Sequence, residues 1–373
     1  VSGIIVALVS IPISMGYAQI AGLPAVYGLY CSILPVLIYG LVTSSPQFVF
    51  GVDATPAALV GGTLATLGIV SGSEEAKAVV PSITLVAALW LLLFFFIKAG
   101  RIVNYISTPV MGGFISGIGV TIILMQAAKL FGGNAGTGEA IKLLMHIAGE
   151  MKSFNLLSAV LGVGTVIIIL IAKKFIPKFP MSVLLMVLGA LATAIFHIDR
   201  CGVKLLPHVD KGLPGFSLPD MSVVFKNPSE IILLGLSVAG VVMAQTLLAT
   251  NNYANKYGYK VSNNREILSY AAANAASAVI GGCPLNGSVS RTGIADQFGC
   301  KSQVMSITAS LTMLLIVLFG TPVLEYLPVP ILTGIVVAAL IGITEFGLAV
   351  KLWKTDHTEF AIFVGAFLGV LLF

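Results

Sequence analysis

The sequence predicts an all-α polytopic membrane protein that lies in a lipid bilayer. Hydrophobic residues make up 57% of the 373 residues and charged residues 9%, whereas an average soluble domain carries about 25% charged residues. So few charges cannot coat a soluble surface, which excludes an ordinary soluble enzyme and a nucleic-acid-binding protein. Apolar stretches of spanning length recur along the chain, and their length favours helices over the short alternating strands of a barrel.

Thirteen apolar segments are expected to form the membrane helices. They cover residues 1–22, 24–43, 53–70, 79–98, 106–131, 155–173, 180–197, 229–252, 264–281, 288–298, 303–319, 328–344 and 357–373. A helix suits these segments because it satisfies every backbone polar group within itself, as lipid requires. The last segment runs to the end of the sequence, so we expect the chain to stop before a fourteenth helix.

Basic residues predict the orientation of the chain. They gather in the loops after even-numbered segments, as Lys98, Arg101, Lys173, Lys174, Lys178, Lys256, Lys260, Arg265, Lys301, Lys351 and Lys354. Short cytoplasmic loops are enriched in Lys and Arg. We therefore expect these loops and the N-terminus on the cytoplasmic side of the cell (inner) membrane, in a multi-pass topology.

Two polar, Gly- and Pro-containing breaks precede the third and tenth segments, at residues 51–56 and 281–288. Such backbone is tolerated at membrane depth only where it is buried in protein or lines a cavity. Paired breaks at corresponding positions of two halves point to the binding site of a secondary transporter. The spacing predicts seven-plus-seven inverted repeats, with residues 1–197 as the first repeat, 198–228 as an extracytoplasmic loop and 229–373 as the second repeat, its last helix missing.

Half-helices that begin at these breaks would turn their N-termini toward the middle of the membrane. Helix N-termini carry unpaired N–H groups and partial positive charge, and together they bind an anion. Arg291 falls in the first turn of the second half-helix, and a charge inside the membrane is a candidate functional residue. We expect Arg291 to face the anion; the alternatives are that it neutralises Asp53 or Asp296, or extends to an interface.

Neighbouring polar residues complete the predicted site. The hydroxyls of Thr55, Ser288, Ser290 and Thr292 can donate to an oxyanion or cap the half-helices, and for Thr55 capping is the preferred interpretation. Asp53 can cap its helix, hold Arg291 in the empty site, or couple a proton to anion binding.

Two residues outside the breaks are further candidates. Gln245 opens the polar run 245–252 and can orient a ligand or cross-link helices. Tyr17 follows Pro12, which removes a backbone hydrogen bond and should kink the first helix; Tyr17 can close one side of the cavity or act as an interfacial aromatic. Gly113 and Gly117 form a GxxxG pair, which predicts close helix packing.

Cofactor and catalytic motifs are not found. The four cysteines and four histidines show no metal-ligand spacing, so neither a metal nor another cofactor is expected. Phosphate-binding loops, nucleophile elbows, HExxH motifs and dinucleotide fingerprints do not occur in a fitting context. The protein is therefore predicted not to be an enzyme.

Five stretches of the sequence resemble the sulfate-permease (SulP) anion-transporter family. They are residues 11–30, 51–54, 257–266, 287–292 and 352–360. The resemblance runs along the whole chain, which is similar to the transmembrane region of a bacterial-type member without the STAS domain that normally follows. It implies a core domain and a gate domain, elevator-type alternating access and a homodimer.

The resemblance also places the substrate between the third and tenth helices. The matching positions are Asp53, Ala54 and Thr55 on one side and Val289, Ser290 and Arg291 on the other, with Tyr17 at an aromatic position of the pocket. Two residues depart from the family pattern. Ile13 stands where many members have Gln, and Gln245 stands where many bacterial members have an acid associated with cation or proton coupling, which leaves Asp53 as the candidate titrating group.

These observations predict a secondary active transporter of small inorganic anions, coupled to a proton or a sodium ion or working by exchange. Sulfate is the first candidate substrate, and bicarbonate or chloride come next. The alternative of a nucleobase permease would require acidic residues in the eighth and tenth helices to bind the base. Gln245 and Arg291 in these helices speak against it. An anion channel, an anion-sensing motor and a membrane scaffold are the remaining alternatives.

Overall fold

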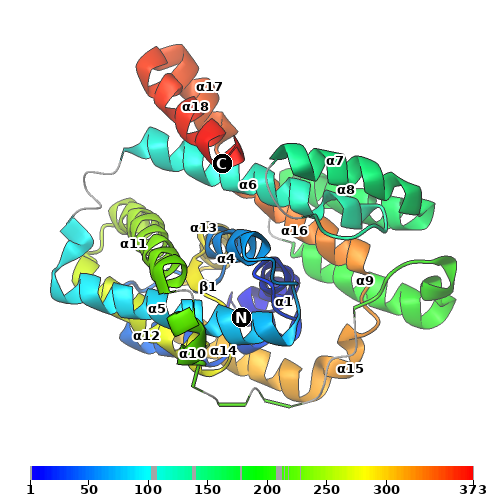
Figure 1. Cartoon of the computed structure of the whole chain (residues 1–373), viewed down its shortest axis with the longest axis horizontal. Helices are drawn as coiled ribbons and strands as arrows, with labels where there is room; N and C mark the ends of the chain where they lie inside the picture. Colours follow the sequence, from blue (N-terminus) through cyan, green and yellow to red (C-terminus); the bar gives the residue numbers. More distant parts are fainter. Residues whose placement is uncertain are drawn as a thin grey trace. The chain divides into compact units, whose positions relative to one another are not determined.

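The computed structural model describes residues 2–101, 107–136, 140–176, 179–206, 212–213, 215–216, 218–226 and 228–372. Helices dominate these residues, and the chain divides into two compact units (Figure 1). The first unit comprises residues 1–106 and 212–318, and the second comprises 107–211 and 319–373. Each unit therefore combines a piece of the N-terminal half with a piece of the C-terminal half.

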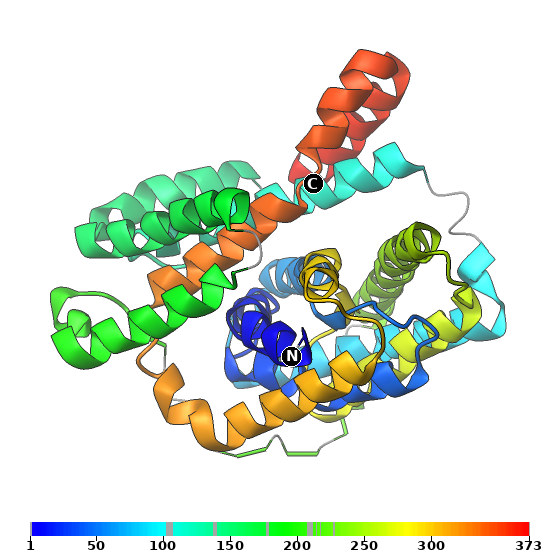
Figure 2. The ribbon, with the colours of Figure 1, turned by 180° about the vertical axis from the view of Figure 1, so that it is seen from behind.

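The first unit holds the two breaks that the sequence singles out. Its helices are α1 (Ser2–Ile20), α2 (Val26–Tyr30), α3 (Leu34–Val42), α4 (Ala54–Thr66), α5 (Glu74–Phe96), α10 (Met221–Lys226), α11 (Pro228–Tyr257), α12 (Asn263–Val279), α13 (Val289–Gln297) and α14 (Val304–Leu315). Two short strands, β1 (Phe50–Val52) and β2 (Leu285–Gly287), pair in its interior. Helix α5 packs against α11 and α12, α12 packs against α3, and α1 lies beside α14 (Figure 2).

The second unit contains the remaining helices. They are α6 (Thr108–Leu130), α7 (Ala140–Glu150), α8 (Leu156–Phe175), α9 (Met181–Phe196), α15 (Thr321–Leu324), α16 (Val329–Ile343), α17 (Phe346–Thr355) and α18 (His357–Leu372). Helix α6 packs against α16 and α18, and α16 also packs against α8. The GxxxG prediction is confirmed: a Cβ on Gly113 would lie 2.2 Å from the Phe363 carbonyl oxygen, and one on Gly117 2.9 Å from the Phe367 carbonyl oxygen, both in α18.

The polytopic membrane character predicted from composition is confirmed. Among the residues that the structure describes, six stretches are long and apolar enough to cross a membrane: Ser2–Ile20, Glu74–Phe96, Thr108–Leu130, Leu156–Phe175, Pro228–Tyr257 and Val329–Thr355. They differ in their surroundings, because 78% of the apolar window in α1 is buried within the protein but only 22% of that in α8. Helix α1 is thus enclosed by protein, whereas α8 leaves apolar side chains such as Val160, Ile167 and Ile171 exposed on its surface.

Several predicted segments are interrupted in the structure. Residues 24–43 form α2 and α3 rather than one helix, and Pro35 at the start of α3 suits a helix N-terminus, where no N–H partner is needed. The segment 303–319 becomes α14 followed by a π-helical stretch, Ile316–Gly320. Helices α7, α10, α15 and α17 lie outside the thirteen expected segments.

Candidate functional site

The two sequence breaks meet as a pair of antiparallel strands. Phe50 pairs with Gly287, Gly51 with Asn286, and Val52 with Leu285. The Ser288 amide continues the ladder by donating to the Val49 carbonyl at 2.9 Å. Each strand leads directly into a helix, β1 into α4 and β2 into α13.

Both helices begin on residues in extended conformation. Asp53 is the N-cap of α4 and Ser288 the N-cap of α13, and neither side chain accepts a capping hydrogen bond. Thr55, expected as a cap, instead lies inside the first turn of α4, one residue before Pro56. The first N–H groups of each helix have no partner within the helix, so two sources of partial positive charge flank one strand pair.

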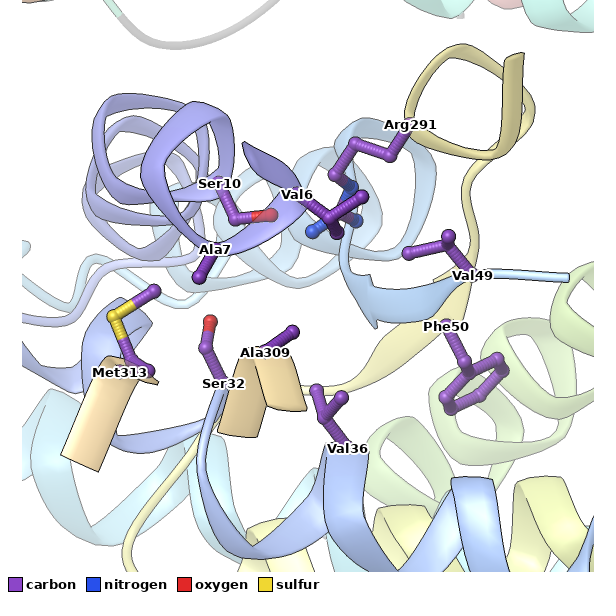
Figure 3. Close-up of a pocket in the computed structure, with 10 residues that line it drawn as sticks. All are labelled: Val6, Ala7, Ser10, Ser32, Val36, Val49, Phe50, Arg291, Ala309 and Met313. Atoms are coloured by element: carbon purple, nitrogen blue, oxygen red, sulfur yellow. The ribbon is translucent and has the colours of Figure 1, made fainter. Parts of the chain in front are cut away.

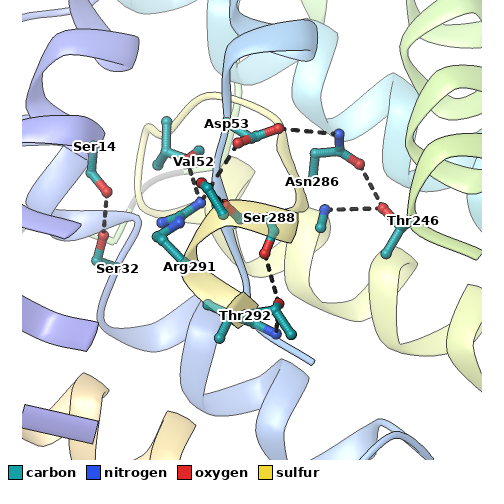
Figure 4. A network of polar contacts seen from close by, with 12 residues as sticks. Ser14, Ser32, Val52, Asp53, Thr246, Asn286, Ser288, Arg291 and Thr292 are labelled. Atoms are coloured by element: carbon teal, nitrogen blue, oxygen red, sulfur yellow. Dashed lines mark hydrogen bonds and ion pairs between the residues drawn. The ribbon is translucent and has the colours of Figure 1, made fainter. Parts of the chain in front are cut away.

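Arg291 extends from α13 across β1. Its Nη2 donates a hydrogen bond to the Val52 carbonyl oxygen at 2.6 Å, and the residue is 2% exposed (Figure 4). Within the described residues, its buried Nε has no hydrogen-bond partner. The low exposure rules out the interpretation in which Arg291 extends to a membrane interface.

Asp53 supplies the nearest carboxylate to Arg291. Its Oδ1 lies 4.0 Å from Arg291 Nη2, and the side chains are 11% and 3% exposed. At this separation the attraction is about 4 kcal/mol for an effective dielectric constant of 20, and it opposes the cost of burying both charges. Asp296, the other carboxylate considered as a partner, instead accepts hydrogen bonds from Lys256 Nζ at 3.0 Å and from the Tyr257 hydroxyl.

A buried amide network adjoins this charge pair. Asn286 Nδ2 donates to Gln245 Oε1 at 2.7 Å and approaches Asp53 Oδ2 at 3.5 Å. The Thr246 hydroxyl donates to Asn286 Oδ1 at 2.6 Å and accepts from the Gly287 amide at 2.9 Å. Helix α11 is therefore fixed to β2 and to the start of α4 through one side chain (Figure 4).

The predicted hydroxyl donors have different surroundings. Thr292 donates to the Ser288 carbonyl at 2.6 Å and accepts from the Val49 amide at 2.9 Å, so its hydroxyl joins α13 to the approach to β1. The hydroxyls of Ser288 and Ser290 lie 3.4 Å apart. Thr55 is 1% exposed, and its hydroxyl has no partner in the described residues. Ser290 and Thr55 therefore retain more capacity to donate to a ligand than Thr292.

The remaining predicted residues lie around the same strand pair. Tyr17 in α1 is 2% exposed, and α1 packs against β1, α4 and α13. Ala54, the first residue of α4, is fully buried, whereas Val289, the first residue of α13, is 47% exposed. The structure thus brings Tyr17, Asp53, Gln245 and Arg291 into one region of the first unit.

A small cavity lies beside the Arg291 guanidinium. Its volume is about 20 Å³, and its lining includes Arg291, Ser10, Ser32, Val49 and Phe50 (Figure 3). A cavity needs roughly 10–15 Å³ to hold one water molecule. The space next to Arg291 therefore fits one water, which can take up a donor of the guanidinium. In the described part of the chain, no three His, Cys, Asp or Glu side chains are placed to hold a metal ion.

The segment that leads into β1 is fixed by a buried carboxylate. Glu266 in α12 is fully buried and accepts hydrogen bonds from the Thr43 hydroxyl at 2.8 Å, the Ser44 amide at 2.6 Å and the Ser45 amide at 3.0 Å. Tyr39 and Tyr270, whose hydroxyls lie 3.4 Å from the same carboxylate, stack on Phe50 of β1 with ring centroids 4.7 and 5.2 Å away. Glu266 therefore positions β1 and, through it, Asp53.

Sequence reasoning did not identify several members of the site. Asn286, Thr246 and Glu266 were not among the predicted site residues. Asn286 stands in the polar break, two residues before Ser288, and Thr246 adjoins Gln245 in the polar run, so both lie within stretches that the sequence singles out. Their roles depend on the strand register, which joins residues far apart in sequence.

Comparison with known proteins places this chain in a family. The family model described as the sulfate permease family matches residues 1–366. The low affinity sulfate transporter 3 of Stylosanthes hamata is 30% identical over 392 residues, covering 99% of this chain and 60% of the relative. A probable sulfate transporter of Mycobacterium tuberculosis is 26% identical, covering 99% of this chain and 67% of the relative. The chain thus spans about three fifths of the plant relative's length.

Solved structures show the same fold. The structure of SLC26A9 superimposes with a TM-score of 0.89 at 22% identity, covering 100% of this chain and 61% of that one. The transmembrane domain of the cyanobacterial bicarbonate transporter BicA superimposes with a TM-score of 0.85 at 20% identity, covering 99% of this chain and 94% of that one. The chain therefore has the fold of these transmembrane domains.

Proposed function

Because the chain belongs to the sulfate permease family, we propose that it is a secondary active transporter of small inorganic anions, with sulfate as its first substrate. The observation that carries the proposal is the buried Arg291 guanidinium beside the strand pair from which α4 and α13 begin. A permanent cation at two helix N-termini favours an anion over a cation or a neutral solute. Sulfate is preferred because the curated relatives are named sulfate transporters.

In this mechanism the protein replaces the hydration shell of the anion. The first N–H groups of α4 and α13 and the hydroxyl of Ser290 donate to its oxygens, while Arg291 supplies the charge. Ala54, Thr55, Val289 and Thr292 shape the walls of the site. Tyr17 closes one side. Asp53 holds Arg291 while the site is empty.

The division into two compact units supports an elevator-type mechanism. The first unit, which carries the site, would move as the core domain, and the second unit would act as the gate domain. In this proposal the units arise from inverted repeats at 1–197 and 229–373, which contribute one break each. The functional assembly is a homodimer in the cell (inner) membrane, and the basic loops place the N-terminus on the cytoplasmic side.

Asp53 is the proposed coupling group. Gln245 cannot change its charge, whereas Asp53 lies at the site and is close enough to Arg291 for protonation to weaken their pairing. Uptake of a proton by Asp53 would release Arg291 toward the anion. Binding of the proton and binding of the anion would then each favour the other. Asp53→Asn should therefore abolish stimulation of uptake by an inward proton gradient. Retained stimulation in that variant would exclude Asp53 as the coupling group and direct attention to sodium or to exchange.

Radiolabelled sulfate uptake into proteoliposomes tests the proposed function. Saturable uptake that unlabelled sulfate suppresses more strongly than bicarbonate or chloride is the expected result. If bicarbonate or chloride suppressed the uptake of labelled sulfate more strongly than unlabelled sulfate does, that anion would replace sulfate as the proposed substrate. Unitary anion currents in a planar bilayer would instead identify a channel. Charge movement without uptake would identify an anion sensor, and inactivity towards all three anions would favour a scaffold.

A further inference from the structure

The orientation of the Asn286 side chain determines which end of the Gln245 amide is available to a ligand. An amide nitrogen and oxygen have nearly the same shape, so their positions follow from the hydrogen-bond network around them. Asn286 is fully buried, and both its amide atoms have partners. Its surroundings therefore settle the direction of the network.

Thr246 fixes the oxygen end of Asn286. The Gly287 amide, which can only donate, reaches Thr246 Oγ1 at 2.9 Å. The same hydroxyl lies 2.6 Å from Asn286 Oδ1, a separation typical of an O–H···O hydrogen bond. Thr246 thus accepts from the backbone and donates its own proton to Asn286.

Asp53 fixes the nitrogen end of the Asn286 amide, and it requires the same orientation of that amide as Thr246 does. An ionised carboxylate only accepts hydrogen bonds, and Asp53 Oδ2 faces Asn286 Nδ2 at 3.5 Å. The second proton of Nδ2 is donated to Gln245 Oε1 at 2.7 Å. Two independent neighbours therefore agree that Gln245 receives a hydrogen bond through its oxygen.

The nitrogen of Gln245 is consequently free to donate. In the part of the chain that the structure describes, no group accepts a hydrogen bond from its Nε2, and this atom is not among the buried unpartnered atoms. The residue retains 8% of its surface exposed. Its N–H₂ group is therefore available to a ligand near Asn286, whose amide also approaches Asp53.

We propose that Asn286 is a positioning residue that holds Gln245 with its N–H₂ group toward the anion, so that Gln245 donates to an oxygen of a bound oxyanion. This inference rests on the proposed anion transport and assigns a specificity role to a residue pair within it. A carboxylate at position 245 would offer only acceptors to the site, which suits a cation. The amide reverses this preference, because it offers two donors and no charge.

Equilibrium binding of radiolabelled sulfate, bicarbonate and chloride to the purified full chain tests the inference. Gln245→Leu and Asn286→Leu should each weaken sulfate binding roughly tenfold, as expected for loss of one hydrogen bond to a charged group. The double variant should be no weaker than Gln245→Leu, because Asn286 acts through Gln245. Thermal unfolding of each variant, measured in parallel, checks that the protein remains folded.

A second variant separates positioning from a structural role. The carboxyl introduced by Asn286→Asp accepts hydrogen bonds once ionised, and it would then draw the Gln245 nitrogen away from the anion. The sulfate affinity of Asn286→Asp should therefore fall as the pH rises. The double variant Gln245→Leu/Asn286→Asp is the control, because it has no amide at position 245 that could turn away from the anion. Its sulfate affinity should fall less over the same pH range.

Each outcome of these experiments decides between the proposals. The positioning role would be overturned if sulfate affinity depended equally on pH in Asn286→Asp and in Gln245→Leu/Asn286→Asp. It would also be overturned if the losses of sulfate affinity in Gln245→Leu and Asn286→Leu added up in the double variant. Either result would leave the proposal of anion transport intact. A wild-type protein that binds none of the three anions would overturn both the transport proposal and the inference that rests on it.

Discussion

Arg291 occupies space that only a glycine at position 51 leaves open. A Cβ atom on Gly51 would lie 2.9 Å from Arg291 Nη1, closer than real Cβ contacts come. Gly51 is paired with Asn286 in the strand ladder, so the backbone has little freedom to retreat. The missing side chain in β1 therefore allows the guanidinium to lie against the strand and bind the Val52 carbonyl.

This contact predicts the effect of Gly51→Ala. The added methyl group should displace Arg291 from the Val52 carbonyl and lower sulfate uptake at least tenfold. The matched control is Gly62→Ala in α4, where a Cβ would meet nothing within 4 Å. Uptake into proteoliposomes should remain at the wild-type level in the control. Equal activity of the two variants would show that Arg291 does not need its observed position.

Glu266 should be essential for folding of the first unit. Glu266→Ala removes the acceptor that the Thr43 hydroxyl and the Ser44 amide use, and each such loss costs about 1–3 kcal/mol. The midpoint of thermal unfolding in detergent should fall by roughly 5 °C or more. Lys260→Ala, an exposed change in the preceding loop, serves as the control. An unchanged midpoint for Glu266→Ala would contradict the proposed anchoring of β1.

Glu266→Gln is a milder test of the same network. The amide nitrogen of the introduced Gln would face a backbone N–H or a hydroxyl that donates to the Glu266 carboxylate in the wild-type protein. One of these donors must therefore lose its acceptor. We expect a smaller loss of thermal stability than for Glu266→Ala, with residual sulfate uptake. A loss as large as that of Glu266→Ala would show that the negative charge, rather than the number of acceptors, stabilises this site.

Close packing of α6 on α18 should tolerate no side chain at Gly113. A Cβ there would stand 2.2 Å from the Phe363 carbonyl oxygen, so Gly113→Val must separate the two helices. The same substitution at Gly365 in α18, where a Cβ meets nothing within 4 Å, is the control. The rate of backbone amide hydrogen exchange in α18 should rise in Gly113→Val and stay at the wild-type value in Gly365→Val. Wild-type protection in Gly113→Val would mean that this contact does not hold α18 in place.

The sequence was sufficient to predict the elements of the site but not its connections. Polar, Gly- and Pro-containing backbone at membrane depth indicated helix starts near Asp53 and Ser288, and α4 and α13 begin there. The sequence predicts that Arg291 faces the anion, with neutralisation of Asp53 or Asp296 as an alternative, and the sequence does not distinguish between these two carboxylates. The choice depends on the strand register, which brings Arg291 against β1.

Asn286 and Glu266 illustrate what local patterns omit. Asn286 stands three residues before the start of α13, yet its role follows from α11, whose Gln245 and Thr246 face it in space. Glu266 lies in the first turn of α12, in a polar stretch typical of a membrane interface, but it is fully buried because the turn after α3 closes over it. Both roles arise from helix packing that hydrophobic periodicity does not encode.

The charge pair of Arg291 and Asp53 is the central element of the proposed mechanism, and one set of variants tests it. Arg291→Met should lower thermal stability, because removal of one partner of a buried pair costs about 3–5 kcal/mol. Asp53→Asn in the same chain should recover most of that loss, since no buried charge is then left unpaired. Sulfate uptake should stay absent, because the cation at the helix N-termini is missing.

The decisive measurement is therefore sulfate uptake by the stable double variant Asp53→Asn/Arg291→Met in proteoliposomes, beside the wild-type protein. A folded double variant without uptake, next to an active wild type, is the result that the account predicts. Wild-type uptake by the double variant would contradict it, because the charge pair would then stabilise the fold without taking part in anion transport.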